Sequence, residues 1–412
     1  MRIVHGCGEQ RFYLLPRCFR GLVSMKLKQR AVDFIVEELS SLSWTSEKQA
    51  HAVYRLEKEE VDTFDAMRTI ARKLRLPPAE VGYAGLKDKH ARSFQYLSLP
   101  THCNIDTMKL PGMTLKRVGY LPAKIQIGDL TGNRFTITVR DLRTIDLTPL
   151  PHSLDDVRCN GVPNYFDSQR FGSVINNVFI AKLLIQNNPE AAVKHFLTAY
   201  QKSEPKQTKD DKRTIASHWN DLDHLHPTDR ILSYIIQEYL TTHSWKKAYL
   251  RIPTHLREIH ANAYQSFLWN ETLKTLLKTT IHNSQLTSVD YAIGILLFPR
   301  TLTTQQKATL PATLYTPSET ALYSGQELAA FKKTLAHEHI TQEDLGRLSD
   351  YDHYLKARPR DTFITPTNLS STTPEPDELN TNTSEERWKL TLSFILPKGS
   401  YATIITKRLF GQ

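Results

Sequence analysis

A single carboxylate in this sequence lies between two lysines, directly after a Gly-x-x-Gly segment. Residues 82–90 read GYAGLKDKH, so Asp88 is flanked by Lys87 and Lys89. A nearby ammonium group favours the ionised form of a carboxylate and lowers its pKa. An ionised Asp on a tight turn is suited to nucleophilic chemistry. Asp88 is therefore the leading catalytic candidate, and the alternative is a solvated surface turn of alternating charge.

Three further segments mix aromatic and polar residues. They read GVPNYFDSQRFG at 161–172, AYQSFLWN at 263–270 and LPKGSYAT at 396–403. GLKDKHA at 85–91 precedes these three segments in the chain. The four segments, in this order along the chain, resemble those of the TruD family of tRNA pseudouridine synthases. The resemblance spans about residues 25–410. Several long segments in one order are more specific than a lone short motif.

The resemblance implies an α+β fold with two parts. A pseudouridine-synthase catalytic domain, mainly antiparallel sheet with flanking helices, would be interrupted by a mostly helical TRUD insertion domain. We expect the catalytic domain at 1–160 and 366–412 and the insertion at 161–365. A length of 412 residues agrees, because single cores stop growing near ~250–300 residues. RNA would lie in the cleft between the two parts.

Alternating apolar and polar residues predict strands towards both ends of the chain. Residues 25–39 are expected to be extended with one buried face. Residues 128–140 predict a strand, and a Gly132-Asn133 turn would lead into it. Residues 388–394 alternate in the same way. These strands would belong to the catalytic domain.

Helical spacing appears elsewhere. Residues 61–76 predict an amphipathic helix with Phe64 on its core-facing side and Asp62 or Thr63 as its cap. In the middle of the chain, helices are predicted at 174–201, 228–242 and 261–279. The polar residues 203–213 predict an exposed loop, and the Pro-containing residues 372–386 a mobile segment.

The activity implied by the resemblance is the isomerisation of uridine to pseudouridine, by family similarity at position 13 of tRNA. The reaction breaks the bond from C1′ to N1 and rejoins the base through C5. It needs no cofactor and no metal, and the sequence has no phosphate-binding loop, dinucleotide fingerprint or convincing metal set. Asp88 could attack the sugar or base, or deprotonate a sugar species. Adjacent residues on an extended strand point to opposite faces, so its salt bridge should come from elsewhere, and the resemblance indicates Lys28.

A base inside a folded RNA must be flipped out and held by stacking and hydrogen bonds. Carried over from the family pattern, the base-contacting residues would be Phe34, Asn133, Phe135 and Tyr401. Phe135 would pack on the uracil face, and Asn133 would pair with its polar edge. At Tyr401 some members of the family carry Phe. The alternatives are core packing for the aromatic residues and a turn for Asn133.

The composition favours a nucleic-acid partner. Lys and Arg total 53 against 43 Asp and Glu, a net charge of +10, and such a field attracts polyanions. The cysteines at 7, 18, 103 and 159 lack metal-ligand spacing and are read as reduced thiols. The N-terminus has no apolar signal region, and no apolar run is long enough for a bilayer. We expect a cytoplasmic protein, monomeric by default, that acts on tRNA without a membrane.

Two other classes of protein remain open. A basic RNA-binding protein without chemistry would keep RNA binding after Asp88→Asn and would never form pseudouridine. A metal-dependent nuclease would be inhibited by EDTA, to which the isomerase should be indifferent. Within residues 164–172 a structural hinge is favoured, with Arg170 facing RNA phosphate. The histidines at 224, 226, 337 and 339 are read as solvated, since residues two apart on a helix point to different faces.

Overall fold

The computed structural model describes residues 25–381 and 385–411, and its largest element is a ten-stranded sheet. The strand order is β14 (Thr367–Ser371), β16 (Trp388–Pro397), β7 (Leu130–Leu142), β1 (Phe34–Ser40), β4 (Arg92–Pro100), β2 (His51–Glu59), β6 (Met113–Leu121) and β5 (Thr107–Leu110). Two short strands join it, β15 (Glu375–Pro376) beside β16 and β3 (Gly82–Tyr83) beside β4. Only β1 and β4 are parallel among these paired strands of the described chain. The predicted α+β class with a mainly antiparallel sheet is confirmed.

The remaining strands form three small two-stranded sheets, in which β9 (Leu286–Tyr291) pairs with β10 (Gly294–Pro299), β11 (Thr313–Tyr315) with β12 (Pro359–Asp361), and β8 (Val162–Pro163) with β13 (Phe363–Ile364). The helices are α1 (Thr63–Leu74), α2 (Thr144–Leu147), α3 (Leu150–Asn160), α4 (Ile180–Ile185), α5 (Pro189–Thr198), α6 (Lys206–Ser217), α7 (Arg230–Thr242), α8 (Trp245–Leu250), α9 (Thr254–Thr280), α10 (Thr304–Thr309), α11 (Gly325–His337) and α12 (Ala402–Phe410). Short 3-10 helices η1 to η6 cover Ala31–Asp33, Pro78–Glu80, Thr101–Cys103, Ser168–Phe171, Asn283–Gln285 and Glu343–Tyr351.

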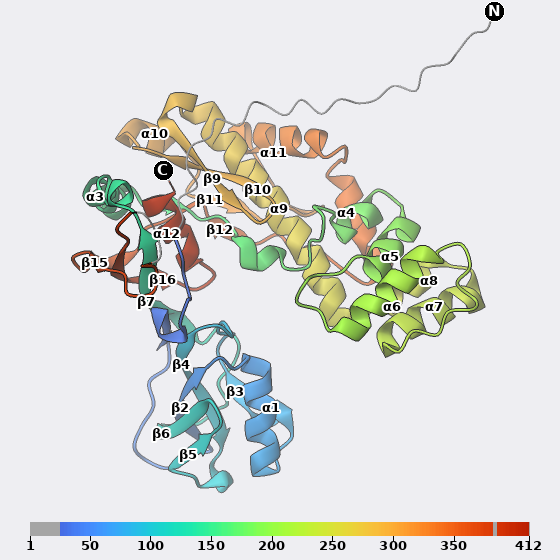
Figure 1. The fold of residues 1–412 in the computed structure, drawn as a ribbon, viewed down its shortest axis with the longest axis horizontal. Coiled ribbons are helices and arrows are strands. Elements are labelled where there is room, and N and C mark those ends of the chain that lie inside the picture. The colour runs from blue at the N-terminus through green and yellow to red at the C-terminus, as the bar shows by residue number, and fades with distance from the viewer. Residues whose placement is uncertain (1–24, 382–384, 412) are drawn as a thin grey trace, which may run out of the picture.

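The two ends of the described chain meet in the main sheet, and the helix-rich middle lies beside it (Figure 1). In Figure 1 the strands β2 to β6 and α1 form one lobe, whereas α5 to α8 gather at the far end of the long helix α9. This arrangement suits the predicted interrupted catalytic domain, whose boundaries stay a prediction. None of the helices in the described residues is long and apolar enough to span a bilayer.

The predicted strands near 135 and 390 are β7 and β16, which are neighbours in the sheet. Phe135 lies opposite Phe394, and both side chains are buried. The expected Gly132-Asn133 turn is wrong, because β7 already begins at Leu130 and Asn133 is paired on both sides. Gly132 serves close approach instead: a Cβ at this position would lie 2.2 Å from the carbonyl oxygen of Leu396.

Helix α1 matches its prediction in place but not in every side chain. Asp62 caps it by accepting hydrogen bonds from the backbone N–H groups of Phe64 and Asp65. Phe64 was expected to face the core, yet it is 48% exposed. Its ring instead meets the edge of Tyr83, with 6.5 Å between the ring centroids.

The predicted middle helices exist with different ends. The expected helix at 174–201 is two helices, α4 and α5, because Asn187 adopts a left-handed backbone (φ +56°) and Pro189 starts α5. The prediction at 228–242 corresponds to α7, and that at 261–279 lies within α9. Helix α9 starts earlier, directly after Pro253.

The predicted loop at 203–213 is wrong, whereas the mobile segment at 372–386 stays a prediction, and its residues 382–384 lie outside the described residues. Residues 206–217 form helix α6, which buries Ile215 and lets Lys212 donate to the carbonyl oxygen of Ala199 at 2.9 Å. Within 372–381, Asp377 is only 3% exposed and accepts hydrogen bonds from the Arg140 guanidinium and the Asp141 N–H. Both segments are held by buried polar contacts with distant residues, which local hydropathy does not reveal.

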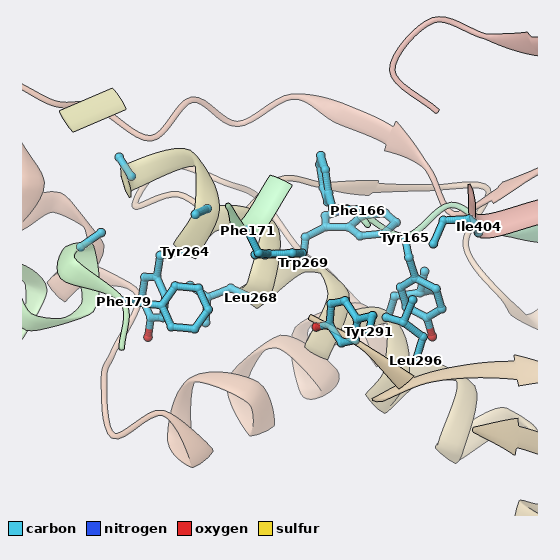
Figure 2. Packing of buried hydrophobic residues seen from close by; sticks show 14 of the residues in the cluster. Tyr165, Phe166, Phe171, Phe179, Tyr264, Leu268, Trp269, Tyr291, Leu296 and Ile404 are labelled. Atoms are coloured by element: carbon cyan, nitrogen blue, oxygen red, sulfur yellow. The ribbon is translucent and has the colours of Figure 1, made fainter. Parts of the chain in front are cut away.

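The aromatic segment at 164–172 belongs to the core. Tyr165, Phe166 and Phe171 are buried and lie against α9 residues such as Trp269 (Figure 2). Asn270 clamps this segment, since its side chain accepts from the Phe166 N–H and donates to the Phe166 carbonyl oxygen. The segment therefore joins the helical part to the sheet through buried contacts, and the hinge predicted within it stays a prediction.

Candidate active site

The loop that carries Asp88 connects β3 to β4, and its backbone is held by hydrogen bonds from the buried side chain of Lys58 and from Thr63. Lys58 on β2 is fully buried and donates to the carbonyl oxygens of Val61, Lys87 and Asp88 at 2.7, 3.3 and 3.0 Å. Burial lowers the pKa of Lys58 to about 8, although the nearby carboxylates of Asp62 and Asp88 oppose this shift. Thr63 exchanges two hydrogen bonds with the backbone of Lys87. The loop backbone is therefore held in one geometry.

The lysines that flank Asp88 in sequence do not pair with it. Lys87 points into the protein and donates to the Glu38 carboxylate at 2.5 Å, with the two side chains 4% and 1% exposed. Lys89 is exposed and forms no ion pair with the described residues. As expected, the salt bridge of Asp88 is formed by neither of the lysines next to it in the sequence.

Lys28 is that partner. Its ammonium group bonds Oδ2 of Asp88, and the two side chains are 20% and 16% exposed. Burial favours the neutral carboxyl, but the Lys28 hydrogen bond and charge and the His90 N–H outweigh it, so the net pKa of Asp88 is lowered. The Lys28 ammonium also lies 4.3 Å from the centroid of the Phe34 ring. Lys28 has a left-handed backbone (φ +61°), and such strain often marks functional sites.

Asp88 borders a cavity of about 150 Å³, a size that admits one benzene-sized ring. The cavity is lined by Phe34, Val36, Leu86, Lys87, Asp88, Asn133, Phe135, Gln169, Ser400, Tyr401, Ala402 and Thr403. The structure thus brings the four expected base-contacting residues together around Asp88. Strand pairing explains this, because β1, β7 and β16 are neighbours and Val36 lies opposite Phe135.

The rings of this cavity are buttressed by further aromatic residues. The Phe34 and Phe135 centroids are 6.3 Å apart in an edge-to-face arrangement, and Phe394 lies 5.7 Å behind Phe135. Tyr401 meets Phe166 edge to face at 6.2 Å. Phe34 and Phe135 are 4% and 7% exposed, so they pack in the core and line the cavity at the same time.

Asn133 supplies a polar group without a protein partner. Its Oδ1 atom is buried and forms no hydrogen bond with the described residues. A buried acceptor without a partner costs free energy, so it calls for an explanation such as a ligand. This oxygen is suited to accept the imide N–H of a uracil ring.

Gln169 was not among the predicted site residues. Its side-chain amide donates to Oδ2 of Asp88, the oxygen that Lys28 also contacts. Asp167 is buried and binds Thr403 and Lys407, so the segment carrying Gln169 is attached to α12. Gln169 and Asp88 are 81 residues apart, so no local pattern connects them. The only signal in the sequence was that Gln169 lies inside the segment at 161–172.

The histidines at 224, 226, 337 and 339 are exposed, as predicted. Within the described residues, one group of three potential ligands lies close together, namely Asp221, Asp223 and His224, and all three are exposed. Glu338, between His337 and His339, instead binds Lys182 and the Tyr264 hydroxyl. Cys103 and Cys159 are free thiols, while the expectations for Cys7, Cys18 and the first residues concern positions outside the described part.

Comparisons with known proteins agree with the resemblance. The family model "tRNA pseudouridine synthase D (TruD)" matches residues 20–409. "Probable tRNA pseudouridine synthase D 2" of Methanocaldococcus jannaschii is 36% identical over 94% of this chain and 92% of its own. The chain belongs to the TruD family.

Other members extend this result. "tRNA pseudouridine synthase D" of Aquifex aeolicus is 27% identical to this TruD-family chain over 94% of it and 98% of the relative. The crystal structure of the putative tRNA pseudouridine synthase D from Methanosarcina mazei aligns with a TM-score of 0.71 at 23% identity, covering 95% of this chain and 94% of that one. This likeness supports the TruD fold over nearly the whole chain.

Proposed function

We propose that this chain is a tRNA pseudouridine synthase that isomerises uridine to pseudouridine, and that its target is position 13. The observation that carries the proposal is the ionised Asp88, paired with Lys28 beside a ring-lined cavity that also holds the unpartnered Asn133 oxygen. Membership of the TruD family and the names of the relatives support the same activity.

The cavity would receive a flipped uracil. Phe135 and Tyr401 supply ring faces against which the base stacks, and Asn133 accepts the imide N–H. Asp88 then acts on the sugar or base as a nucleophile, or removes a proton from a sugar species once the base has left. The bond from C1′ to N1 breaks, the bond from C1′ to C5 forms, C5 loses a proton and N1 gains one. No atom is lost and no redox partner is needed.

Lys28 and Gln169 would keep Asp88 ionised and oriented. Both donate to the same oxygen, Oδ2, while the His90 N–H binds Oδ1 at 2.9 Å. A carboxylate with several donors is stabilised in its charged form. Its orientation towards the cavity provides the positioning that a nucleophile or base requires.

The experiment compares the native protein with Asp88→Asn on a tRNA transcript, reading pseudouridine by chemical mapping. The variant should bind RNA and form no pseudouridine, whereas Asp221→Asn, an exposed carboxylate outside the cavity, should retain activity. A second transcript with cytidine at position 13 should remain unmodified. Pseudouridine at another position of that transcript would refute the proposed target but not the activity.

A further inference from the structure

Gln169 brings an exposed amide to a fixed position beside the catalytic carboxylate. It lies in the 3-10 helix η4, two residues before the buried Phe171. On its other side, Asp167 is 2% exposed and is hydrogen-bonded to helix α12. The backbone is thus anchored before and after Gln169, while its side chain is exposed and reaches Asp88. An amide held in this way is suited to recognise one group of a substrate.

The side-chain oxygen of Gln169 is open to a ligand. Its amide nitrogen donates to Oδ2 of Asp88, whereas no donor among the described residues binds its Oε1 atom. Asp88 already accepts three hydrogen bonds. Lys28 and Gln169 donate to its Oδ2, and the His90 N–H donates to its Oδ1. A carboxylate has about four acceptor positions, so one is left for the reacting atom, and a further donor of the substrate would find its acceptor in Gln169.

The depth of the catalytic cavity determines which part of a nucleotide meets Gln169. The base would fill the inner part, where Phe135 and the Oδ1 atom of Asn133 are buried. Gln169 is exposed, so it marks the side of the cavity that is open to solvent. The ribose stays joined to the RNA backbone and would therefore lie on this side, next to Asp88. Whether Asp88 attacks C1′ or takes a proton from C2′, the 2′-hydroxyl is on the same carbon or on the adjacent one.

The other polar side chains of the cavity are less suited to bind this hydroxyl. Lys87 and Thr403 already donate to buried carboxylates of the protein. Ser400 and Tyr401 line the cavity, but within the described residues neither hydroxyl is bonded to the catalytic carboxylate. Gln169 combines a hydrogen bond to that carboxylate with an acceptor that has no partner in the described part of the chain.

We propose that Gln169 makes the enzyme specific for a ribose at the target nucleotide: its Oε1 accepts a hydrogen bond from the 2′-hydroxyl while its amide nitrogen holds Asp88. The 2′-hydroxyl is the group by which a protein distinguishes RNA from DNA at a given site. An amide fits this double task because it donates and accepts at the same time. The inference rests on the proposed function and adds to it a contact with the sugar.

The test compares two synthetic tRNAs that differ in one hydroxyl group, with uridine or 2′-deoxyuridine at the target position. The value of kcat/KM for pseudouridine formation is measured with both tRNAs, for the native enzyme and for Gln169→Leu. The preference for uridine should fall about two- to tenfold in the variant, which corresponds to the loss of one neutral hydrogen bond. If Gln169 only positioned Asp88, both tRNAs would be slowed equally and the preference would stay unchanged. That result would overturn the proposal.

Matched variants locate the effect. Gln305→Leu removes another exposed amide, on helix α10 outside the cavity, and should leave the rates with both tRNAs at the native values. Ser400→Ala and Tyr401→Phe remove the two remaining hydroxyl groups of the cavity. Both should keep the native preference for uridine, even where they slow the reaction. A preference that falls in either of them and not in Gln169→Leu would contradict the assignment.

The sugar contact and the activity can fail separately. An active native enzyme whose preference survives Gln169→Leu refutes only the role of Gln169. A variant too slow to follow is replaced by a binding measurement, in which the ratio of the two Kd values is compared between Asp88→Asn and Asp88→Asn/Gln169→Leu. This ratio should also fall about two- to tenfold, and an unchanged ratio would overturn the proposal. A native protein that forms no pseudouridine would refute the proposed function, and the same Kd ratio would still decide the sugar contact.

Discussion

The buried pair of Lys87 and Glu38 predicts a large penalty for Lys87→Met. Both side chains are almost fully buried, and Glu38 keeps only one other described donor, the Tyr96 N–H at 3.1 Å. Removing one partner of a buried ion pair costs about 3–5 kcal/mol, because the remaining charge lacks compensation. The loss should appear locally as amide hydrogen exchange that is faster on the order of 10²- to 10⁴-fold in the loop before β4, read by mass spectrometry.

Two matched variants make this prediction decisive. Lys87→Met/Glu38→Gln should restore most of the protection, since it removes the orphaned charge together with its partner. Lys89→Met, on the exposed lysine two positions along the chain, should change stability by less than about 0.5 kcal/mol. If Lys87→Met exchanged no faster than Lys89→Met, the role of Lys87 as the buried support of the Asp88 loop would be refuted.

Three further predictions concern the same site. Lys28→Met removes the group that lowers the pKa of Asp88, so the acidic limb of the single-turnover rate should move to higher pH; an unmoved limb would exclude this role. Asn133→Leu should lower kcat/KM by a factor that corresponds to about 1–3 kcal/mol. Its stability should change little, because Oδ1 of Asn133 has no partner among the described residues. An equal loss of binding to RNA that lacks the target uridine would contradict this role. Lys58→Met should cost at least about 2 kcal/mol, because the carbonyl groups of Val61 and Asp88 lose this donor while that of Lys87 keeps the Thr63 hydroxyl. The pKa of Lys58 is about 8 in the folded protein and 10.5 ordinarily, so between pH 8 and pH 10.5 the unfolded chain binds more protons than the folded one. The free energy of unfolding should therefore rise with pH in this range. Urea unfolding should show this rise for the native protein and not for the Lys58→Met variant.

The sequence revealed the strands and the position of Asp88 because both depend on local patterns. Phe135 and Phe394 lie in alternating runs, and such alternation follows directly from the geometry of a strand. The Gly132-Asn133 segment misled because its glycine is required by the neighbouring strand β16 and not by a turn. Helix α6 was missed because its stability depends on Lys212 and Asp211, whose partners Ala199 and Asp229 lie outside the segment.

The partners within the site depend on contacts that no local pattern encodes. Lys28 and Gln169 reach Asp88 from 60 and 81 residues away, and only the family resemblance indicated Lys28. Glu38 occupies an alternating strand in which a charged residue normally faces solvent, yet it turns inward to bind Lys87. Lys87 lies in the interior because it pairs with Glu38, whereas Lys89 is exposed. The sequence alone shows two lysines beside Asp88 and does not tell which of them is buried.

Asp88→Asn tests the central claim most directly. The substitution keeps the size of the side chain and removes the charge that Lys28 stabilises. Incubated with a tRNA transcript in excess over the enzyme, the variant should yield no pseudouridine while its Kd for the transcript stays near that of the native protein. Pseudouridine formed by the variant at a rate close to the native one would contradict the assignment of Asp88 as the catalytic carboxylate.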